Sequence, residues 1–246
     1  MPRATPSHWR KRGLLAWLLL PLAGLFAGVA AVRRWAYRLG WMRITRLPVP
    51  VVVVGNIAVG GSGKTPVVLW LVDALRRAGY CPGIVSRGYG GQVGGVALVP
   101  GDGDPARYGD EPVLLAQQAG CPVAVGADRP TAALHLLAAH PECNVLVSDD
   151  GLQHYRLGRR VEVVVVDDAV LGNRWRLPAG PLREGLGRLA EADLVIVHGA
   201  LGSDVSAAAG SVAVAPMSLE GQEFVSLTDP RQRCKAADFQ GGRVHG

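Results

Sequence analysis

The sequence has few cysteines and none of the spacings that common metal or redox sites need. Its four cysteines lie far apart, with no Cys-x-x-Cys pair and no histidine at ligand spacing beside them. These absences argue against a zinc site and against a dithiol redox motif. Cys81 and Cys121 each precede a proline where a strand is expected to begin, and there we expect small buried thiols. Such sparse cysteine usage is typical of a reducing compartment.

Signatures of nucleic-acid-binding modules are also absent, although the formal net charge is +6. A basic protein gains affinity for phosphate backbones from charge alone. Here much of the excess lies in two N-terminal clusters, namely Arg3, Arg10, Lys11 and Arg12, and then Arg33, Arg34, Arg38, Arg43 and Arg46. We therefore expect no nucleic-acid partner, and no segment indicates a protein partner.

Charge is missing altogether from residues 13–32. A helix of that length would rise roughly 30 Å, about one hydrocarbon thickness. Pro21, Gly24 and Gly28 favour a bent or interfacial segment as readily as a straight span. The stretch exceeds the ~7–15 residues of a signal-peptide core, and arginines follow it directly, so a membrane anchor is favoured over a signal peptide or a buried helix. We expect residues 1–47 to associate with a membrane, at a depth that the sequence leaves open.

Residues 48–246 have the pattern of an α/β domain. The hydrophobic content of 49% is ample for a core. Short Val, Ile and Leu runs, typical of strands buried on both faces of a sheet, occur at 49–54, 83–86, 123–125, 145–148, 161–166, 194–197 and 212–215. Helical patterns lie between them at 65–78, 111–119 and 131–139. This alternation predicts a mostly parallel sheet with flanking helices, as in P-loop NTPases. The glycine-rich segment 88–103 predicts a loop or a small β-hairpin at one edge of the site.

The most specific motif is a phosphate-binding loop between the first strand and the first helix of this domain. Glycines there allow several backbone N–H groups to converge on a phosphate. Lys64 would reach the β- and γ-phosphates of ATP, and the Thr65 hydroxyl would bind Mg²⁺. The full pattern requires a glycine at position 58, where this chain has alanine. The predicted ATP-binding residues are Ala58, Val59, Gly60, Gly61, Ser62, Gly63, Lys64 and Thr65.

A second magnesium ligand is expected at the end of a neighbouring hydrophobic strand. Two pairs of carboxylates qualify, Asp149–Asp150 and Asp167–Asp168. The first pair is favoured because a turn rich in functional groups follows it, with Gln153 and His154 as candidate substrate contacts. Adjacent carboxylates repel each other, so a cation beside them is physically sensible.

Three further polar residues have both a structural and a functional interpretation. Asp110 precedes Pro112 at an expected helix start, where it would cap the helix or act as a general base for an attacking hydroxyl. Arg87 leaves a strand into glycines and would hold a phosphate through two hydrogen bonds. Arg183 lies on a proline-rich loop, where exposure and function are equally plausible.

Five segments in this order carry a family resemblance: VGNIAVGGSGKTP at 54–66, SRGYGG at 86–91, GDEP at 109–112, SDDGLQH at 148–154 and LPAGPLRE at 177–184. With them the chain resembles the tetraacyldisaccharide 4'-kinases of lipid A biosynthesis. The resemblance implies transfer of the ATP γ-phosphate to the 4'-hydroxyl of an acylated glucosamine disaccharide 1-phosphate, among the lipids at the cytoplasmic face of the bacterial inner membrane. It favours Asp110 as the catalytic base, beside Lys64 and Asp150, and Asp149–Asp150 over Asp167–Asp168. Members of the family also tolerate a residue other than glycine at the position of Ala58.

One departure from the family concerns the C-terminal end. Such kinases continue into a further segment with an Asp-His-His motif, whereas this chain stops at Gly246, and its His245 lies in no such motif. The resemblance therefore implies a chain that lacks the C-terminal part. Two other hypotheses stay open from the sequence: a membrane-tethered P-loop NTPase switch and a catalytically incomplete nucleotide-binding fragment.

Overall fold

The computed structural model describes residues 6–221, 223–225, 231–235 and 238, and the chain divides into two compact units. The first unit comprises residues 1–216 and the second residues 217–246. In the second unit, β9 (Glu223–Val225) and β10 (Arg233–Lys235) form a two-stranded antiparallel sheet. The predicted boundary between residues 47 and 48 stays a prediction, and His245 lies outside the described residues.

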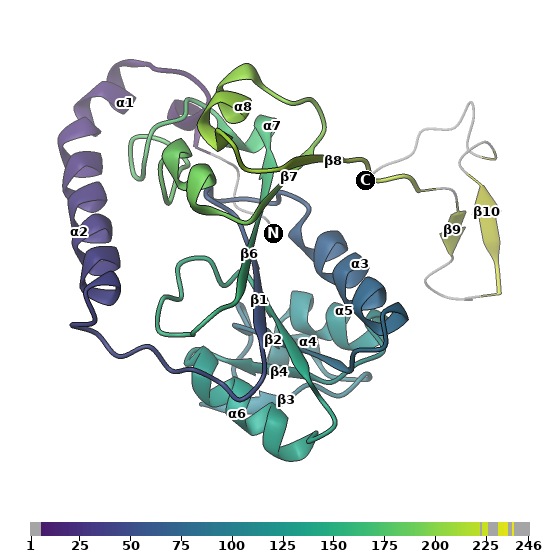
Figure 1. The fold of residues 1–246 in the computed structure, drawn as a ribbon. Coiled ribbons are helices and arrows are strands. Elements are labelled where there is room, and N and C mark those ends of the chain that lie inside the picture. The colour runs from purple at the N-terminus through teal and green to yellow at the C-terminus, as the bar shows by residue number, and fades with distance from the viewer. Residues whose placement is uncertain (1–5, 222, 226–230, 236–237, 239–246) are drawn as a thin grey trace. The chain divides into compact units, whose positions relative to one another are not determined.

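An eight-stranded sheet, shown in Figure 1, forms the centre of the first unit, with strand order β3-β4-β2-β5-β1-β6-β7-β8. The pairs from β4 through β2, β5, β1 and β6 to β7 are parallel, and β3 runs antiparallel to β4. The strands are β1 (Val51–Gly55), β2 (Pro82–Ser86), β3 (Val96–Leu98), β4 (Val123–Gly126), β5 (Val145–Asp149), β6 (Val161–Asp167), β7 (Leu194–His198) and β8 (Val214–Met217). The predicted mostly parallel α/β sheet is confirmed.

Helices cover the sheet because each presents one apolar face to it. Helix α3 (Lys64–Arg77) packs against β1, β2 and β5 and beside α5 (Asp110–Gln118), whereas α6 (Arg129–Ala139) packs against β2, β3 and β4. The remaining short elements are α4 (Pro105–Tyr108), α7 (Asp168–Leu171), the 3-10 helix η2 (Leu186–Glu191) and α8 (Ser203–Ala209). Because parallel strands end at the same edge, the segments after β1, β2 and β5 meet there.

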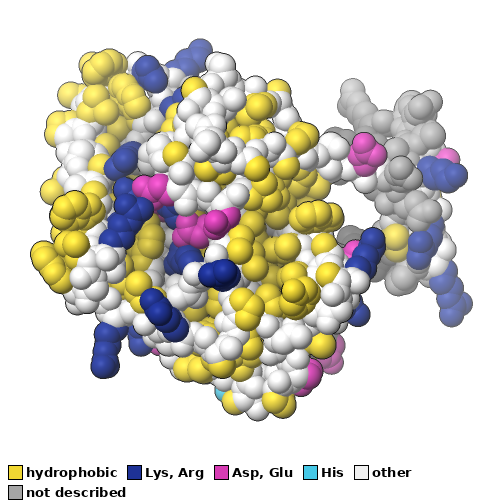
Figure 2. All heavy atoms as spheres, viewed as in Figure 1, with side chains coloured by type: hydrophobic (Ala, Val, Ile, Leu, Met, Phe, Trp, Pro, Cys, Tyr) yellow, Lys and Arg dark blue, Asp and Glu magenta, His cyan; other side chains and the backbone are white. Residues whose placement is uncertain are grey.

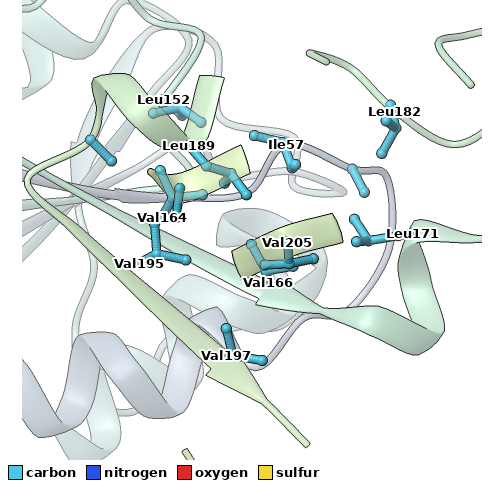
Figure 3. Close-up of a cluster of buried hydrophobic side chains, with 13 residues drawn as sticks. Ile57, Leu152, Val164, Val166, Leu171, Leu182, Leu189, Val195, Val197 and Val205 are labelled. Carbon is cyan, nitrogen blue, oxygen red and sulfur yellow. The ribbon is translucent and has the colours of Figure 1, made fainter. Parts of the chain in front are cut away.

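A hydrophobic cluster holds the β6–β7 side of the sheet against the residues that precede the phosphate loop (Figure 3). Ile57 and Leu152, which lie close to the loop and to the carboxylate pair, are fully buried in it. Val164 and Val166 of β6 contribute from the sheet, and Leu189 contributes from η2. This packing fixes the backbone on both sides of the expected site, since a well-packed core leaves little room for displacement.

The N-terminal region is helical but divided. After the 3-10 helix η1 (Ser7–Trp9), α1 (Leu14–Leu18) ends one residue before α2 (Leu20–Arg38) begins. Pro21 lies in the first turn of α2, where its missing N–H costs no hydrogen bond. Among the described residues, no helix has both the length and the apolar character needed to cross a bilayer.

Two local predictions were wrong in detail. The segment 88–103 contains β3, which extends the main sheet by pairing with β4 rather than forming a hairpin of its own. Cys81 is exposed and Cys121 is half-buried, whereas the buried thiol is that of Cys143, which follows α6. A proline after a cysteine therefore did not indicate burial. Both Cys-Pro pairs lie at the N-terminal ends of their strands, where β2 and β4 begin.

Candidate active site

The phosphate-loop motif connects β1 to α3, as its sequence predicted. Gly63 caps α3 with a left-handed backbone (φ 80°), and Gly60 has φ 127°. Residues with a Cβ rarely adopt these angles, so both positions need glycine. A Cβ on Gly61 would meet no protein atom within 4 Å, so the fold leaves open space there. Ser62 is fully buried, and its hydroxyl has no hydrogen-bond partner among the described residues.

Alanine suits position 58, where the motif has glycine. The Ala58 backbone has no positive φ, and its side chain is fully buried. Its N–H donates to Asn56 Oδ1 at 3.0 Å, and it forms an antiparallel bridge with Leu182. This bridge fixes the proline-rich loop against the start of the phosphate loop, and the Arg183 N–H adds a 2.7 Å hydrogen bond to the carbonyl of Ile57.

Three charged side chains form a connected series from the phosphate loop to the proline-rich loop. Lys64 Nζ lies 3.7 Å from Asp150 Oδ1, and Arg183 Nη1 donates to both carboxylate oxygens of Asp150 at 3.2 and 3.0 Å. Burial opposes ionisation of Asp150, but Lys64 and Arg183 outweigh it and hold its pKa below the ordinary value. Asp150 also has φ 46°, a left-handed conformation that is rare outside glycine. Such strain is concentrated at functional sites.

The neighbouring carboxylate, Asp149, has the opposite environment. It is 2% exposed, and Ser86 Oγ donates to it at 3.1 Å. Burial, reinforced by the charges of Glu111 and Asp150, raises the pKa of Asp149 to about 6. The two adjacent carboxylates are therefore electrostatically distinct, which the sequence alone did not indicate.

The other acidic pair is engaged in local structure. Asp167 caps α7 by accepting from the Ala169 N–H at 2.9 Å, and its second carboxylate oxygen lies 3.1 Å from His198 Nδ1. Asp168 pairs with Arg174 at 2.7 Å. Among the described residues, no hydrogen bond or ion pair connects this pair to the phosphate loop.

Asp110 opens α5 but does not cap it. The N-cap is Gly109, and no side chain accepts a capping hydrogen bond there, whereas Asp104 caps the preceding α4. The capping interpretation of Asp110 was therefore wrong. Its side chain is exposed and makes no hydrogen bond or ion pair with any residue that the structure describes. Gly109 holds this helix start against the loop after β2, since a Cβ there would lie 2.5 Å from the Tyr89 carbonyl oxygen.

A pocket of ≈380 Å³ brings the predicted substrate contacts together. Its polar lining includes Arg87, Asp150, Gln153, His154 and Arg183. Apolar side chains from α2 and from the proline-rich loop line the same pocket, namely Phe26, Val29, Ala30 and Leu177. We call this the acceptor pocket, because it has polar and apolar walls and reaches Asp150, which pairs with Lys64 of the phosphate loop.

His154 is neutral in this pocket at ordinary pH. Burial lowers the pKa of His154 to about 4, and the positive charges of Arg129, Arg87 and Arg33 act in the same direction. A neutral imidazole keeps one nitrogen free as an acceptor. Next to it, Gln153 Nε2 donates to Glu184 Oε1 at 2.8 Å and to the Asn56 carbonyl at 3.1 Å, which links the turn after β5 to the phosphate loop.

The sequence analysis missed two residues that organise this site. Arg129 is 1% exposed, and its Nη2 donates to the backbone carbonyl of Asp149 at 2.9 Å. Burial lowers its pKa to about 10, a value at which it stays charged. Glu184 accepts from both Gln153 and Tyr155. No local pattern marks Arg129, since an arginine at a helix start is usually exposed, whereas Glu184 follows Arg183 directly in the LPAGPLRE segment.

The oxygen donors fit a magnesium ion better than a transition metal. Among the residues that the structure describes, no three histidine, cysteine, aspartate or glutamate side chains form a metal cluster. A nucleotide-bound Mg²⁺ needs only one or two protein oxygens, because phosphates and water supply the rest. Asp149 ends β5 and Asp150 follows it, and β5 lies next to β1, from which the phosphate loop leads to Thr65. Thr65 Oγ1 has no hydrogen-bond partner in the described chain.

Comparisons with known proteins agree on one family. A family model described as tetraacyldisaccharide-1-P 4'-kinase matches residues 15–245. The tetraacyldisaccharide 4'-kinases of Aromatoleum aromaticum and Azoarcus sp. are 61% and 60% identical over 245 residues, which is 100% of this chain and 73% and 71% of theirs. Among solved structures, the "apo" form of LpxK from Aquifex aeolicus in complex with ATP matches with a TM-score of 0.69 and 35% identity, over 75% of this chain and 59% of that one.

Proposed function

The chain belongs to the tetraacyldisaccharide-1-P 4'-kinase family, and we propose that it transfers the γ-phosphate of ATP to the 4'-hydroxyl of a tetraacyldisaccharide 1-phosphate in lipid A biosynthesis. The observation that carries the proposal is the series Lys64–Asp150–Arg183, which connects the phosphate loop to the acceptor pocket. Phosphoryl transfer depends mainly on positioning and on charge stabilisation. Lys64, Asp150 and Arg183, which lie where the phosphate loop meets the acceptor pocket, can position the reacting groups and stabilise their charge.

The donor, ATP, binds in this proposal to residues Ala58–Thr65. Gly60 and Gly63 allow the backbone N–H groups to turn toward the phosphates, and the open space at Gly61 lets a phosphate approach the backbone. Lys64, whose side chain is 11% exposed, contacts the β- and γ-phosphates. The N-terminus of α3 adds the favourable field of a helix end.

Magnesium is held by Thr65 together with Asp149 or Asp150. When bound, the ion neutralises charge on the β- and γ-phosphates. Asp150 is ionised and exposed enough to reach a ligand, whereas the buried Asp149 accepts from Ser86. We assign Asp150 the direct or water-mediated contact, and Asp149 supports the backbone that presents it.

The acceptor lies in the pocket beside α2, with its sugar against Arg87, Gln153, His154 and Arg183 and its acyl chains along the apolar wall. Asp110 is the proposed catalytic base. Its carboxylate is exposed and free of intramolecular partners, so it is available to accept a proton from the hydroxyl.

In this proposal the enzyme lies at the cytoplasmic face of the inner membrane, and the exposed apolar side chains of α1 and α2 support it. Leu18, Leu22, Leu25, Val29 and Val32 form an apolar stripe at helical spacing, and each is at least half exposed. Figure 2 shows hydrophobic side chains on the outer side of this region. A helix with such a stripe binds the interface with its apolar face in the acyl boundary.

The test is to incubate the full chain with γ-labelled ATP, Mg²⁺ and a tetraacyldisaccharide 1-phosphate in detergent micelles. We expect label on the lipid, and Asp110→Asn should lower kcat by about 10²–10⁴ without changing the KM for ATP. Label released only as inorganic phosphate, with stimulation by a protein, would favour the NTPase switch. Binding of ATP without transfer or hydrolysis would favour an incomplete fragment.

A further inference from the structure

Helix α2 runs along one side of the first unit with little apolar packing beneath it (Figure 1). Ala23 and Tyr37 are its buried residues, among nineteen in the helix. Residues along its length line three cavities in succession, the acceptor pocket and two further cavities of ≈270 and ≈620 Å³. A helix that borders cavities gains little from burial, because the hydrophobic free energy scales with the apolar area removed from water. Other contacts must therefore hold α2 in place.

The helix is anchored at two places. The first anchor lies in α1, directly before α2, where Trp17 meets Trp175 edge to face with 5.0 Å between the ring centroids. The second lies near the end of α2, where the ring of Tyr37 packs beside that of Tyr155 with 5.9 Å between the centroids. The residues of α2 that line the acceptor pocket, within 26–33, lie between the two anchors. The position of this pocket wall therefore depends on both.

Charged contacts at the second anchor converge on one carboxylate, that of Glu191 at the end of η2. Arg34 Nη1 donates to Glu191 Oε2 at 3.2 Å, and Arg38 Nη2 donates to the same oxygen at 2.7 Å. Arg188 Nη1 lies 3.6 Å from that oxygen. Figure 2 shows acidic and basic side chains gathered beside this helix. Without the charge of Glu191, the three arginines would repel one another, and this repulsion would oppose the docking of α2.

The body of the first unit fixes the position of Glu191. Its neighbour in η2, Leu189, is fully buried in the hydrophobic cluster of Figure 3. Arg188 is 5% exposed, and its Nη2 donates to Glu162. The side chain of Glu191 is 32% exposed and carries its two hydrogen bonds to α2 from this rigid base. A contact with a group that is already ordered costs less entropy.

We infer that Glu191 is a positioning residue for the lipid acceptor, because its contacts with Arg34 and Arg38 hold α2 against the acceptor pocket. The inference rests on the proposed function, in which the acyl chains lie along the apolar wall of that pocket. Ala30 lies one helical turn before Arg34, and Phe26 lies about two turns before it, so a displacement at the second anchor moves this wall. Glu191 thus acts on the acceptor through α2.

The experiment measures transfer of labelled γ-phosphate from ATP to the tetraacyldisaccharide 1-phosphate by the wild type and by Glu191→Gln. In the variant, the KM for the lipid should rise about fivefold to tenfold. Both kcat and the KM for ATP should stay at the wild-type values. Glu191→Asp keeps the charge and should restore most of the affinity for the lipid. Asp128→Asn is the matched control, because Asp128 and Arg156 form an ion pair of similar exposure that does not involve α2.

A second set of variants tests whether Glu191 acts through α2. The double variant Arg34→Gln with Arg38→Gln should raise the KM for the lipid as much as Glu191→Gln does. The triple variant should show no further rise, because all three changes remove the same contact. Additive effects, a change in the KM for ATP, or an unchanged KM for the lipid in Glu191→Gln would overturn the inference.

Hydrogen exchange tests the contact without relying on transfer. In one detergent, peptides from residues 20–38 should exchange at least about tenfold faster in Glu191→Gln than in the wild type, since a helix freed from its anchor opens more often. Peptides from α3 should exchange equally in both. Equal exchange of α2 in the two proteins would overturn the inference.

Failure of the proposed function can be recognised separately. If the wild type transfers phosphate to no lipid, the proposed function fails, and equilibrium binding of the tetraacyldisaccharide 1-phosphate in micelles then tests the role of Glu191. The wild type should bind this lipid more tightly than Glu191→Gln, and Asp128→Asn should bind it as the wild type does. Equal binding by the wild type and Glu191→Gln would contradict a positioning role.

Discussion

The two adjacent carboxylates at the end of β5 show how single residues acquire different properties from their surroundings. Asp149 is buried beside Ser86, and burial raises its pKa. Asp150 turns out of the strand with a left-handed backbone and meets Lys64 and Arg183, which hold its pKa low despite burial. One residue therefore supports the backbone, and the next presents a permanent negative charge to the site.

Replacement of Asp150 by Asn tests whether the site needs the negative charge of this residue. The variant loses its ion pairs with Lys64 and Arg183, and we expect γ-phosphate transfer to fall at least about 100-fold, because the site loses a preorganised charge. The rate of transfer is measured as label appearing on the lipid in a single turnover. Asp168→Asn is the control from the other acidic pair and should keep transfer within about threefold of the wild type. Equal losses of transfer activity in the two variants would contradict a specific role for Asp150.

The low pKa of His154 predicts a pH dependence with a definite sign. The folded-state pKa of about 4 lies below the ordinary 6.5, so the unfolded chain binds more protons between these values. The contribution to stability is complete above pH 6.5 and is lost as the pH falls toward 4. Since the ring is partly exposed, we expect a loss of about 1–2 kcal/mol.

Two measurements check the prediction for His154. Its imidazole signals, assigned by their absence in His154→Gln, should stay those of a neutral ring down to pH 5 in an NMR titration. In urea unfolding, the wild type should lose more stability than His154→Gln between pH 7 and pH 5. A ring that titrates near pH 6.5 would show that the charges around it do not act as described.

At the scale of elements, the position of α5 depends on a glycine. Gly109 has φ 93°, and a Cβ there would lie 2.5 Å from the Tyr89 carbonyl oxygen. This close approach fixes the helix start that carries Asp110 against the loop after β2. Helix α5, which carries the proposed base Asp110, is thus held by the close approach of Gly109 to the Tyr89 backbone. The Asp110 side chain does not cap this helix.

Gly109→Ala should destabilise the fold by about 1–3 kcal/mol, because alanine must adopt a strained φ and displace the Tyr89 backbone. Gly101→Ala is a suitable control, since a Cβ at Gly101 meets nothing within 4 Å and its φ is not positive. The midpoints of urea unfolding compare the two variants. A Gly109→Ala midpoint equal to that of the control would show that α5 does not need this contact.

The sequence was most informative where one element obeys a strong local rule. Runs of valine placed β1, β5 and β6 to within a few residues, because strands buried on both faces need continuous apolar residues. The pattern missed β3, whose three residues lie in a glycine-rich segment and pair only with β4. Long-range contacts were beyond a local pattern: Arg183 meets Asp150 across 33 residues, and Arg129 is buried because its guanidinium meets the Asp149 carbonyl.

At the scale of the whole molecule, one face of the first unit combines apolar and basic character. The stripe along α2 is exposed, and Phe26, Val29 and Ala30 of the same helix line the acceptor pocket, so Val29 belongs to both. A lipid substrate can therefore keep its acyl chains against the stripe while its sugars lie in the pocket. The same helix would serve membrane association and substrate binding.

Removal of the apolar stripe should weaken binding to membranes. Leu25 and Val32 are seven residues apart on one face of α2 and are 65% and 69% exposed. Leu25→Ser with Val32→Ser should lower the partition coefficient onto phospholipid vesicles at least about tenfold. Leu114→Ser with Leu134→Ser alters exposed leucines of α5 and α6 and should leave it unchanged, as measured by vesicle cosedimentation. Equal losses in both double variants would argue against a specific membrane face.

The central claim is that donor and acceptor sites meet at Asp150. The most direct measurement is a crystal structure of the chain with a non-hydrolysable ATP analogue, Mg²⁺ and the tetraacyldisaccharide 1-phosphate. We predict the γ-phosphate beside Lys64 and the 4'-hydroxyl in the acceptor pocket, within reach of both Asp150 and the carboxylate of Asp110. A nucleotide outside the loop of residues 58–65, or a sugar bound away from the pocket of Gln153, His154 and Arg183, would contradict the account.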